Sequence, residues 1–530
     1  MNSNTSKVLS LTTALLLLGT GACTDPTVGP SSTVSENTIF KDPGSYRAFL
    51  AKLYAGLTVT GQKGPSGDAS TRDIFSIPDE GFSQYMRMYW EFQELPTDEA
   101  VIAWGDNGLP EMNTQQWGAT NPFISGMFSR IYFQIVMTNE FLRQTTDAKL
   151  SERGVGSTLR AQIQTYRAEA RFLRALSTWH ALDLYGNVPL VTSIQTEPPK
   201  QNTRQEIYDF LVSELNDIRG QLPAAGPGVY GRATDAAASM LLAHVQLNAE
   251  VYTGTAHYGE ALAAAQAVIA GPFTLDPSYR HLFQADNNTS PEMIFAVTQD
   301  GQHTQSYGGT TFLIHASCGG NPGDPNYQNP ATYGIDGCWF GLRLKPEAYA
   351  LSAGDPRASY FFTSGRTPAI NSISAFNDGI AAPKYTNMTS LGVAGSNPGF
   401  PDTDFPMFRL ADAYLIYAEA ALRGGGGDLN TALGYVNALR QRAYGDASGN
   451  ITLPQLTTDF VLDERSRELL WEGHRRADLI RYGKFTGGTY VWAWKGGTLA
   501  GTATDSHLNL YPLPASQLVA NPNLKQNTGY

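Results

Sequence analysis

Apolar residues recur every three to four positions along much of the chain, which is the spacing of one face of an α-helix. Residues 45–57 have Phe49, Leu50 and Leu53 at this spacing. Residues 123–145 are apolar on most sides, so this helix is expected to be buried. Further helices are expected over residues 159–186, 204–222, 233–252, 257–271, 408–423 and 429–445. The pattern therefore predicts a mainly α-helical protein.

Some of these helices carry small residues and tyrosines where neighbouring helices would cross. Ala261 and Ala265 follow Tyr258 at helical spacing, and the helices over 408–423 and 429–445 repeat the pattern. Such positions are typical of tetratricopeptide-like helix pairs, although a regular repeat of about 34 residues is absent. Ordinary helix hairpins with alanine at their contacts explain the pattern equally well.

The middle of the chain has a different character. From about residue 272 to residue 405, Gly, Pro, Asn, Ser and aromatic residues dominate, and few segments have helical spacing. Loops held by a rigid scaffold commonly carry binding residues. We therefore expect a loop-rich insertion in the helical scaffold.

The segment 463–485 concentrates acidic and basic side chains. Read as one helix, it places Glu464, Glu468 and Glu472 in a column on one face, with Arg475 projecting between them. An arginine beside carboxylates lowers their pKa values, whereas a general acid needs a raised pKa. This argument favours a structural role for the acidic column.

Asp478 extends the cluster, because it lies three residues from both Arg475 and Arg481. The alternative is that Glu468 and Glu472 are the paired carboxylates of a secreted glycoside hydrolase. We interpret the cluster as a structural network made of Glu464, Glu468, Glu472, Arg475, Asp478 and Arg481. Gly473, inside the predicted helix, suggests that another part of the chain approaches closely there.

The first 40 residues differ from the rest. The apolar run 8–21 is too short to cross a bilayer comfortably but fits the core of a signal peptide. It ends in small residues before Cys23, as in bacterial lipoprotein signals, so Cys23 is expected to be lipidated. Residues 1–22 would then be the signal peptide, and the Pro/Ser/Thr-rich residues 23–40 a flexible tether. A plain secretory signal is the alternative.

The protein has 3 cysteines. With Cys23 lipidated, Cys318 and Cys338 remain, and an exported protein lies in an oxidising compartment. We expect a disulfide between them, with two buried thiols as the alternative. His315 is the only histidine nearby and no Cys-x-x-Cys motif is present, so we expect no metal site and no cofactor.

The formal net charge of −11 argues against nucleic acid as a partner, because nucleic-acid-binding proteins usually carry a basic patch. Two loop segments, 103–117 and 321–340, instead combine aromatic rings with Asn and Asp. Aromatic faces stack on the C–H surfaces of sugars, while amides and carboxylates bind sugar hydroxyls, so these segments suit a carbohydrate. The candidate ligand-binding residues are Trp104, Asp106, Asn107, Trp117, Asn326, Tyr327, Tyr333 and Trp339.

Several longer motifs resemble those of the SusD/RagB family. They are "RAEARFLRALSTWHALDLYGNVPLV" (167–191), "FRLADAYLIYAEA" (408–420), "ERSRELLWEGHRRADLIRYGKF" (464–485), "LYPLPASQL" (510–518) and "NPNLKQNTGY" (521–530). These motifs occur in the order of the family and span most of the chain.

The resemblance implies one SusD-like binding domain over residues 41–530, with tetratricopeptide-like helix pairs as the scaffold and the ligand site in the loop-rich portion. It also implies a lipoprotein of the outer membrane, exposed on the cell surface, that is not an enzyme. Such proteins bind an oligosaccharide or polysaccharide, or in some members a peptide. They pass the ligand to a SusC-type TonB-dependent transporter.

Overall fold

The computed structural model of the protein describes residues 36–65, 72–74, 77, 81–226 and 228–530. The predicted signal peptide and Cys23 lie outside these residues, as does most of the predicted tether. Residues 47–530 form one compact unit, which carries the features described below. Within the part of the chain that is described, none of the helices combines the length and the apolar character needed to cross a bilayer.

The prediction of a mainly helical protein is confirmed. The α-helices are α2 (Glu36–Ile39), α3 (Gly44–Ala55), α4 (Tyr85–Glu94), α5 (Leu109–Thr114), α6 (Pro122–Gln144), α7 (Asp147–Glu152), α8 (Ser157–Tyr185), α9 (Arg204–Arg219), α10 (Asp235–Leu247), α11 (Ala249–Thr253), α12 (Tyr258–Ile269), α13 (Gly309–Ala316), α14 (Pro346–Leu351), α15 (Leu410–Leu422), α16 (Leu429–Tyr444), α17 (Thr458–Leu469), α18 (Arg475–Arg481) and α19 (Ala515–Ala520).

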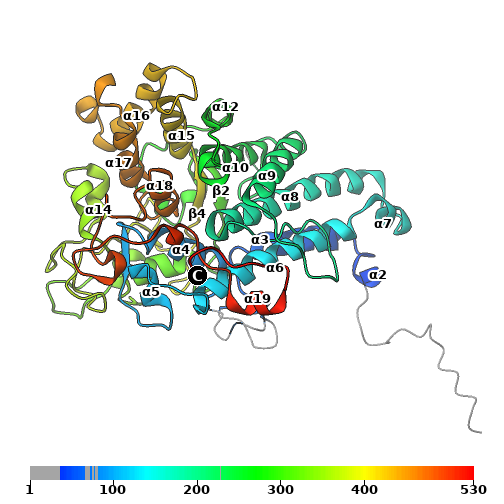
Figure 1. Cartoon of the computed structure of the whole chain (residues 1–530), viewed down its shortest axis with the longest axis horizontal. Helices are drawn as coiled ribbons and strands as arrows, with labels where there is room; N and C mark the ends of the chain where they lie inside the picture. Colours follow the sequence, from blue (N-terminus) through cyan, green and yellow to red (C-terminus); the bar gives the residue numbers. More distant parts are fainter. Residues whose placement is uncertain (1–35, 66–71, 75–76, 78–80, 227) are drawn as a thin grey trace, which may run out of the picture. The chain divides into compact units, whose positions relative to one another are not determined.

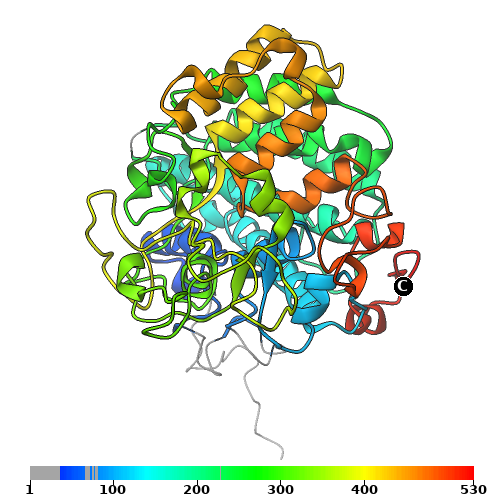
Figure 2. The same ribbon diagram turned by 90° about the vertical axis from the view of Figure 1, so that its left-hand side faces the viewer.

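The longer helices pack against one another in the order of the sequence, with α12 and α15 in contact across the loop-rich portion that separates them in the chain. α6 contacts α8, α8 contacts α9, α9 contacts α10, α10 contacts α12, α12 contacts α15, and α15 contacts α16 (Figure 1). Stacking of consecutive helices in this way is the arrangement of tetratricopeptide-like scaffolds, in which each unit buries its apolar face on its neighbours. In Figure 2 the helices α15 to α17, yellow to orange, lie above the green and yellow loops of residues 272–405.

The helix ends follow from capping side chains. Asn121 accepts hydrogen bonds from the first backbone N–H groups of α6, and Pro122 takes the first helical position. Thr203 and Glu206 form a reciprocal capping box at the start of α9. Gly445 ends α16 with a φ of 78°, in the left-handed region that glycine favours.

The prediction of one helix over residues 463–485 is wrong. α17 ends at Leu469 and α18 begins at Arg475, and between them Trp471 and Gly473 have φ values of 61° and 83°. A β-carbon on Gly473 would lie 2.7 Å from the ring of Tyr89, so another segment does approach closely here. The turn is stabilised by Glu94, whose Oε1 accepts the backbone N–H of Gly473 at 2.7 Å.

Four short strands tie the loop-rich portion to the helices. They are β1 (Ala100–Ile102), β2 (Met293–Val297), β3 (Leu342–Leu344) and β4 (Phe405–Arg409). β1 pairs with β3 and β2 pairs with β4, both antiparallel. Each pair therefore joins segments more than 100 positions apart in the chain, a contact that helical periodicity does not reveal.

Candidate functional site

The pair of β1 and β3 brings the two predicted ligand-binding segments together. The chain leaves β1 toward Trp104 and enters β3 from Trp339, so the antiparallel pairing places both residues at the same end. The indole N–H of Trp104 donates to the backbone carbonyl of Trp339 at 2.9 Å, and the two rings lie 6.3 Å apart. The two tryptophans thus form one aromatic surface.

This surface belongs to an open hollow with a volume of about 690 Å³, called the first hollow below. Both indoles are half-buried, whereas Tyr307 and Asp106 are exposed. The ring of Tyr307 lies 6.1 Å from that of Trp339, edge to face. The lining residues are Gly81, Phe82, Arg87, Trp104, Asp106, Tyr307, Cys338, Trp339 and Phe340. The hollow offers aromatic faces with a cation and a carboxylate beside them.

His315 and a neighbouring disulfide hold Trp339 in place. Its ring stacks on the buried imidazole of His315, with 4.5 Å between centroids, and its backbone N–H donates to the backbone carbonyl of His315 at 2.7 Å. Burial lowers the pKa of His315, so this imidazole is neutral and accommodates the indole face. Cys318 and Cys338 form a disulfide that joins the end of α13 to the residue preceding Trp339. The aromatic surface is therefore organised before any ligand arrives.

Trp104 also depends on a close backbone approach. A β-carbon on Gly341 would lie 2.9 Å from the Trp104 ring and 3.1 Å from Ala316, so only glycine leaves room for the indole at this position. The Trp104 ring also packs edge to face on Phe312 of α13. The indole is thus held by contacts with both Gly341 and α13.

Arg87 supplies the positive charge of the first hollow. Its guanidinium carbon lies 5.4 Å from the Trp104 ring centroid and 4.7 Å from that of Phe312, within cation–π distance. Its Nε donates to Glu91, one turn further along α4, at 2.9 Å. Burial raises the pKa of Glu91 to about 7, and the charge of Arg87 opposes this shift.

Three of the predicted ligand residues lie elsewhere. Trp117 is buried in the core, where its ring packs on Tyr511 and its indole N–H donates to the hydroxyl of Tyr530 at 2.8 Å. Asn326 is also buried. Tyr333 is buried and accepts a hydrogen bond from Gln328, and it lines a separate hollow. In these positions the long-range fold, rather than the local composition, determines which ring faces solvent.

The other five predicted ligand residues differ in whether they line the first hollow. Trp104, Asp106 and Trp339 line the first hollow. Asn107 is exposed and Tyr327 is half-buried, and neither is among the residues that line it. Sequence reasoning missed Arg87 and Phe82, which lie outside both candidate loops. The only local signal for Arg87 is an arginine within the otherwise apolar run at the start of α4.

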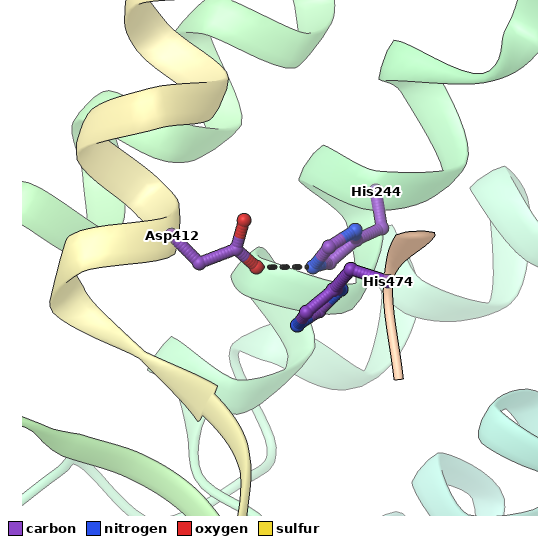
Figure 3. A group of neighbouring side chains, drawn as sticks. All are labelled: His244, Asp412 and His474. Atoms are coloured by element: carbon purple, nitrogen blue, oxygen red, sulfur yellow. Dashed lines mark ion pairs between the residues drawn. The ribbon is translucent and has the colours of Figure 1, made fainter. Parts of the chain in front are cut away.

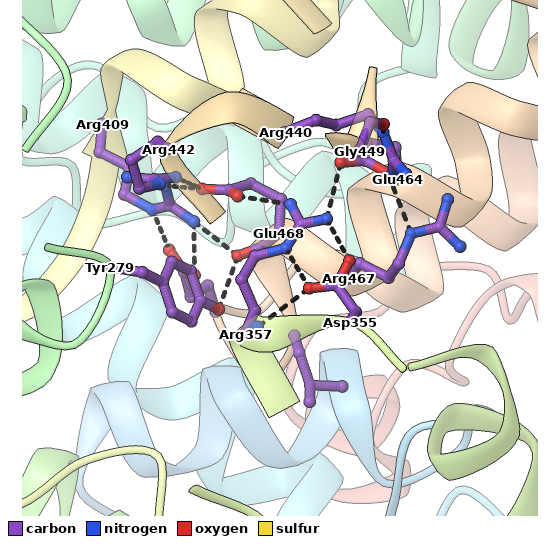
Figure 4. Close-up of polar contacts among 12 residues, drawn as sticks. Tyr279, Asp355, Arg357, Arg409, Arg440, Arg442, Gly449, Glu464, Arg467 and Glu468 are labelled. Atoms are coloured by element: carbon purple, nitrogen blue, oxygen red, sulfur yellow. Dashed lines mark hydrogen bonds and ion pairs between the residues drawn. The ribbon is translucent and has the colours of Figure 1, made fainter. Parts of the chain in front are cut away.

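The acidic column forms a buried ionic network (Figure 4). Glu468 accepts hydrogen bonds from Arg357 at 2.7 Å, from Arg409 at 2.6 Å and from Arg442. Burial alone would raise the pKa of Glu468, but the three guanidinium groups lower it well below its usual range. Glu468 is therefore ionised and fully paired, which is the opposite of what a general acid requires.

The neighbouring carboxylates are held in the same way. Glu464 pairs with Arg357 at 2.7 Å, and Glu472 pairs with Arg409 at 2.6 Å and with Lys384 at 2.7 Å. Burial opposes ionisation of both, but their cationic partners lower both pKa values.

The expectation that Arg475 lies among these glutamates is wrong. Because the chain turns at residues 470–474, Arg475 points elsewhere and pairs with Asp98 at 2.6 Å. Asp478 pairs with Arg481, as the spacing predicted, at 2.7 Å and also with Arg465 at 2.7 Å. The arginines that bridge the acidic column come from distant segments.

One other cluster contains possible metal ligands, namely His244, Asp412 and His474 (Figure 3). His244 Nε2 lies 2.7 Å from Asp412 Oδ2, and the other carboxylate oxygen accepts a hydrogen bond from Arg465 at 2.7 Å. The two imidazoles are nearly parallel, at 6°, with centroids 5.5 Å apart. Lone pairs in two stacked planes do not converge on one ion. Burial lowers the pKa of His474 to about 4, so the geometry fits a close polar contact between His244 and Asp412 beside a stacked neutral His474.

The amino-acid sequence is similar to a known protein family and to several known proteins. The family model described as the SusD family matches residues 347–530. The starch-binding protein SusD of Bacteroides thetaiotaomicron is 36% identical over 91% of this chain and 91% of its own length. The SusD-like protein P2 of Formosa agariphila is 24% identical over 99% of this chain and 100% of its own.

Solved structures have the same fold. A surface glycan-binding protein A of Bacteroides thetaiotaomicron, in complex with laminarihexaose, superposes with a TM-score of 0.68 at 21% identity, covering 91% of this chain and 98% of that one. A SusD superfamily protein of the same organism gives a TM-score of 0.69 at 21% identity, covering 92% and 99%. From the 36% identity across nearly the whole chain, this protein belongs to the SusD family.

Proposed function

We propose that the protein binds a glycan in the first hollow and delivers it to a SusC-type TonB-dependent transporter. The observation that carries this proposal is the aromatic surface of Trp104, Trp339 and Tyr307 around an open space of about 690 Å³. Half-buried rings present faces to sugar C–H groups, while Arg87 and Asp106 offer a donor and an acceptor for hydroxyl groups. The protein would bind without cleaving, because the carboxylates of the acidic column are ionised and paired.

The substrate class that we propose is a starch-type α-glucan. Its support is the similarity to a relative named as a starch-binding protein over nearly the full length of both chains. A protein anchored to the cell surface is in a position to pass the glycan to a transporter. In this proposal residues 1–22 are removed, Cys23 carries lipid, residues 23–40 act as a tether, and residues 41–530 bind the ligand at the outer face of the outer membrane.

Binding can be tested by calorimetry with maltoheptaose, laminarihexaose and an unrelated peptide. We expect maltoheptaose to bind, and Trp104→Ala or Trp339→Ala to weaken binding by about tenfold or more, because each removes a stacking ring. Tyr327→Ala is the matched control, since this aromatic residue of the same loop region is not among those that line the first hollow.

Loss of binding in Tyr327→Ala with retention in both tryptophan variants would contradict the location of the site. Binding of the peptide alone would contradict the glycan class. Release of reducing ends from starch by the purified protein would contradict the absence of enzymatic activity.

A further inference from the structure

A second hollow, of about 410 Å³, lies in the loop-rich portion. It contains a run of three half-buried aromatic residues, Tyr360, Phe361 and Phe362, at the end of the 3-10 helix η4 (Pro356–Tyr360). Arg280 and Gln284 line it from another segment of the chain. None of these residues forms part of the first hollow.

Arg280 supplies the positive charge of the second hollow. Its guanidinium carbon lies 5.1 Å from the ring centroid of Tyr360, and one Nη donates to the carbonyl of Lys384 at 2.8 Å. Among the described residues, no carboxylate lies within ion-pair distance of it, whereas Arg357 and Arg409 each contact more than one. A guanidinium has five N–H donors, so donors remain for a ligand in the hollow.

The second hollow repeats the chemistry of the first. In each, an arginine packs over an aromatic ring, at 5.4 Å for Arg87 and Trp104 and at 5.1 Å for Arg280 and Tyr360. In each, further half-buried aromatic rings and polar side chains complete the lining. This combination serves C–H surfaces and hydroxyl groups at the same time, which is what a pyranose chain presents.

The two hollows lie on the same short stretch of chain. Tyr333 lines the second hollow, and Cys338 and Trp339 line the first. Six residues of extended chain span at most about 20 Å, so the two linings are close in space. The disulfide of Cys338 with Cys318 ties this stretch to α13. A long polysaccharide could therefore contact both hollows at once.

We infer that the second hollow is a separate carbohydrate-binding site, which holds a further stretch of the glycan bound in the first hollow. This inference rests on the proposed function. Two linked sites raise the affinity for a polysaccharide by making the second contact intramolecular, whereas a ligand short enough for one site gains nothing.

The test compares two ligands and two readouts of the purified protein. Soluble starch is measured by affinity electrophoresis and maltoheptaose by calorimetry. We expect Arg280→Gln and Phe361→Ala each to weaken starch binding by about fivefold or more, while affinity for maltoheptaose at the first hollow changes by less than about twofold. The two variants act on different parts of the lining, so a folding defect in one does not prevent the test.

Arg366→Gln is the matched control. Arg366 also packs on an aromatic ring, 4.4 Å from Phe376, and donates only to backbone carbonyls among the described residues, but it is not among those that line the second hollow. We expect this variant to bind starch as the unchanged protein does. Melting temperatures of all three variants report on folding.

Unchanged starch binding in both Arg280→Gln and Phe361→Ala would overturn the second site. Equal weakening in Arg366→Gln would also overturn it, because the effect would then be one of stability. If the unchanged protein binds neither ligand, the proposed function itself fails. If Trp339→Ala abolishes binding but the second-hollow variants do not weaken it, only this inference fails.

Discussion

The contacts and pKa values of single residues in the ionic network show whether they stabilise the fold or could transfer protons. Glu468 is fully buried and contacts three arginines, and its pKa is lowered rather than raised. A carboxylate of this kind stabilises the folded state through its partners, and removing it leaves buried charges unpaired. The residues that looked most catalytic in the sequence are therefore the least suited to proton transfer.

Glu468→Gln is expected to lower the free energy of unfolding by about 3 kcal/mol or more, because three buried guanidinium groups lose a charged partner. Urea denaturation measures this. Asp459→Asn is the matched control on the same helix, since Asp459 is exposed and its pairing with Lys484 contributes less than about 1 kcal/mol. Maltoheptaose affinity should be the same in both variants. If the unchanged protein cleaved starch and only Glu468→Gln failed to do so, the structural role would be contradicted.

The pH dependence of stability should have two limbs. Burial raises the pKa of Glu91 to about 7, compared with ~4.3 in an unfolded chain, so the folded protein retains a proton that the unfolded chain releases. The free energy of unfolding therefore falls as pH rises from about 4.5 through 7. Carboxylates with a lowered pKa act in the opposite sense. Asp478, with a pKa of about 2, contributes stability that is lost as pH falls from about 4 toward 2.

Glu91→Gln tests the upper limb. One group with such a shift accounts for about 3 kcal/mol between pH 4.5 and pH 8, and the glutamine variant should lack this part of the slope. Urea midpoints at pH 5 and pH 8 measure it, with the exposed Glu260→Gln as the control. Identical slopes in Glu91→Gln and in the unchanged protein would contradict the assignment of a buried, protonated Glu91.

At the level of elements, the short pair of β1 and β3 determines the site. Neither strand has more than three residues, and both are buried. Yet their pairing brings Trp104 next to Trp339. Two residues of α13 contact these rings, Phe312 that of Trp104 and His315 that of Trp339. Helical periodicity predicts the long helices well, but it gives no information about the pairing of two tripeptides that lie 240 positions apart.

Gly341→Ala should weaken glycan binding, because the added methyl group would lie 2.9 Å from the Trp104 ring and displace it. We expect a loss of about tenfold in affinity, corresponding to roughly 1.4 kcal/mol. Gly337→Ala is the matched control in the same segment, where a β-carbon meets no atom within 4 Å. Calorimetry with maltoheptaose compares the two, and equal affinities would contradict the role of this close approach.

At the level of the whole molecule, segments that are distant in the sequence form hydrogen bonds with one another. Tyr530, the last residue, accepts a hydrogen bond from Trp117 and donates one to the carbonyl of Leu510 at 2.6 Å. This explains why Trp117, which looked like a ligand residue, is a core residue instead. In the same way, the three arginines that bind Glu468 are Arg357, Arg409 and Arg442, which no local pattern connects with it.

The sequence by itself determined the helical architecture, the loop-rich middle portion, the family and the residue types of the proposed carbohydrate site, because each of these depends on local spacing, composition or long motifs. Only the tertiary structure decided which aromatic rings meet. Trp104 and Trp339 come together through β1 and β3, Arg87 joins them from α4, and Trp117 turns inward to the C-terminus. Such pairings depend on long-range packing and backbone hydrogen bonds, and residues at any separation can satisfy them, so no periodicity in the chain encodes them.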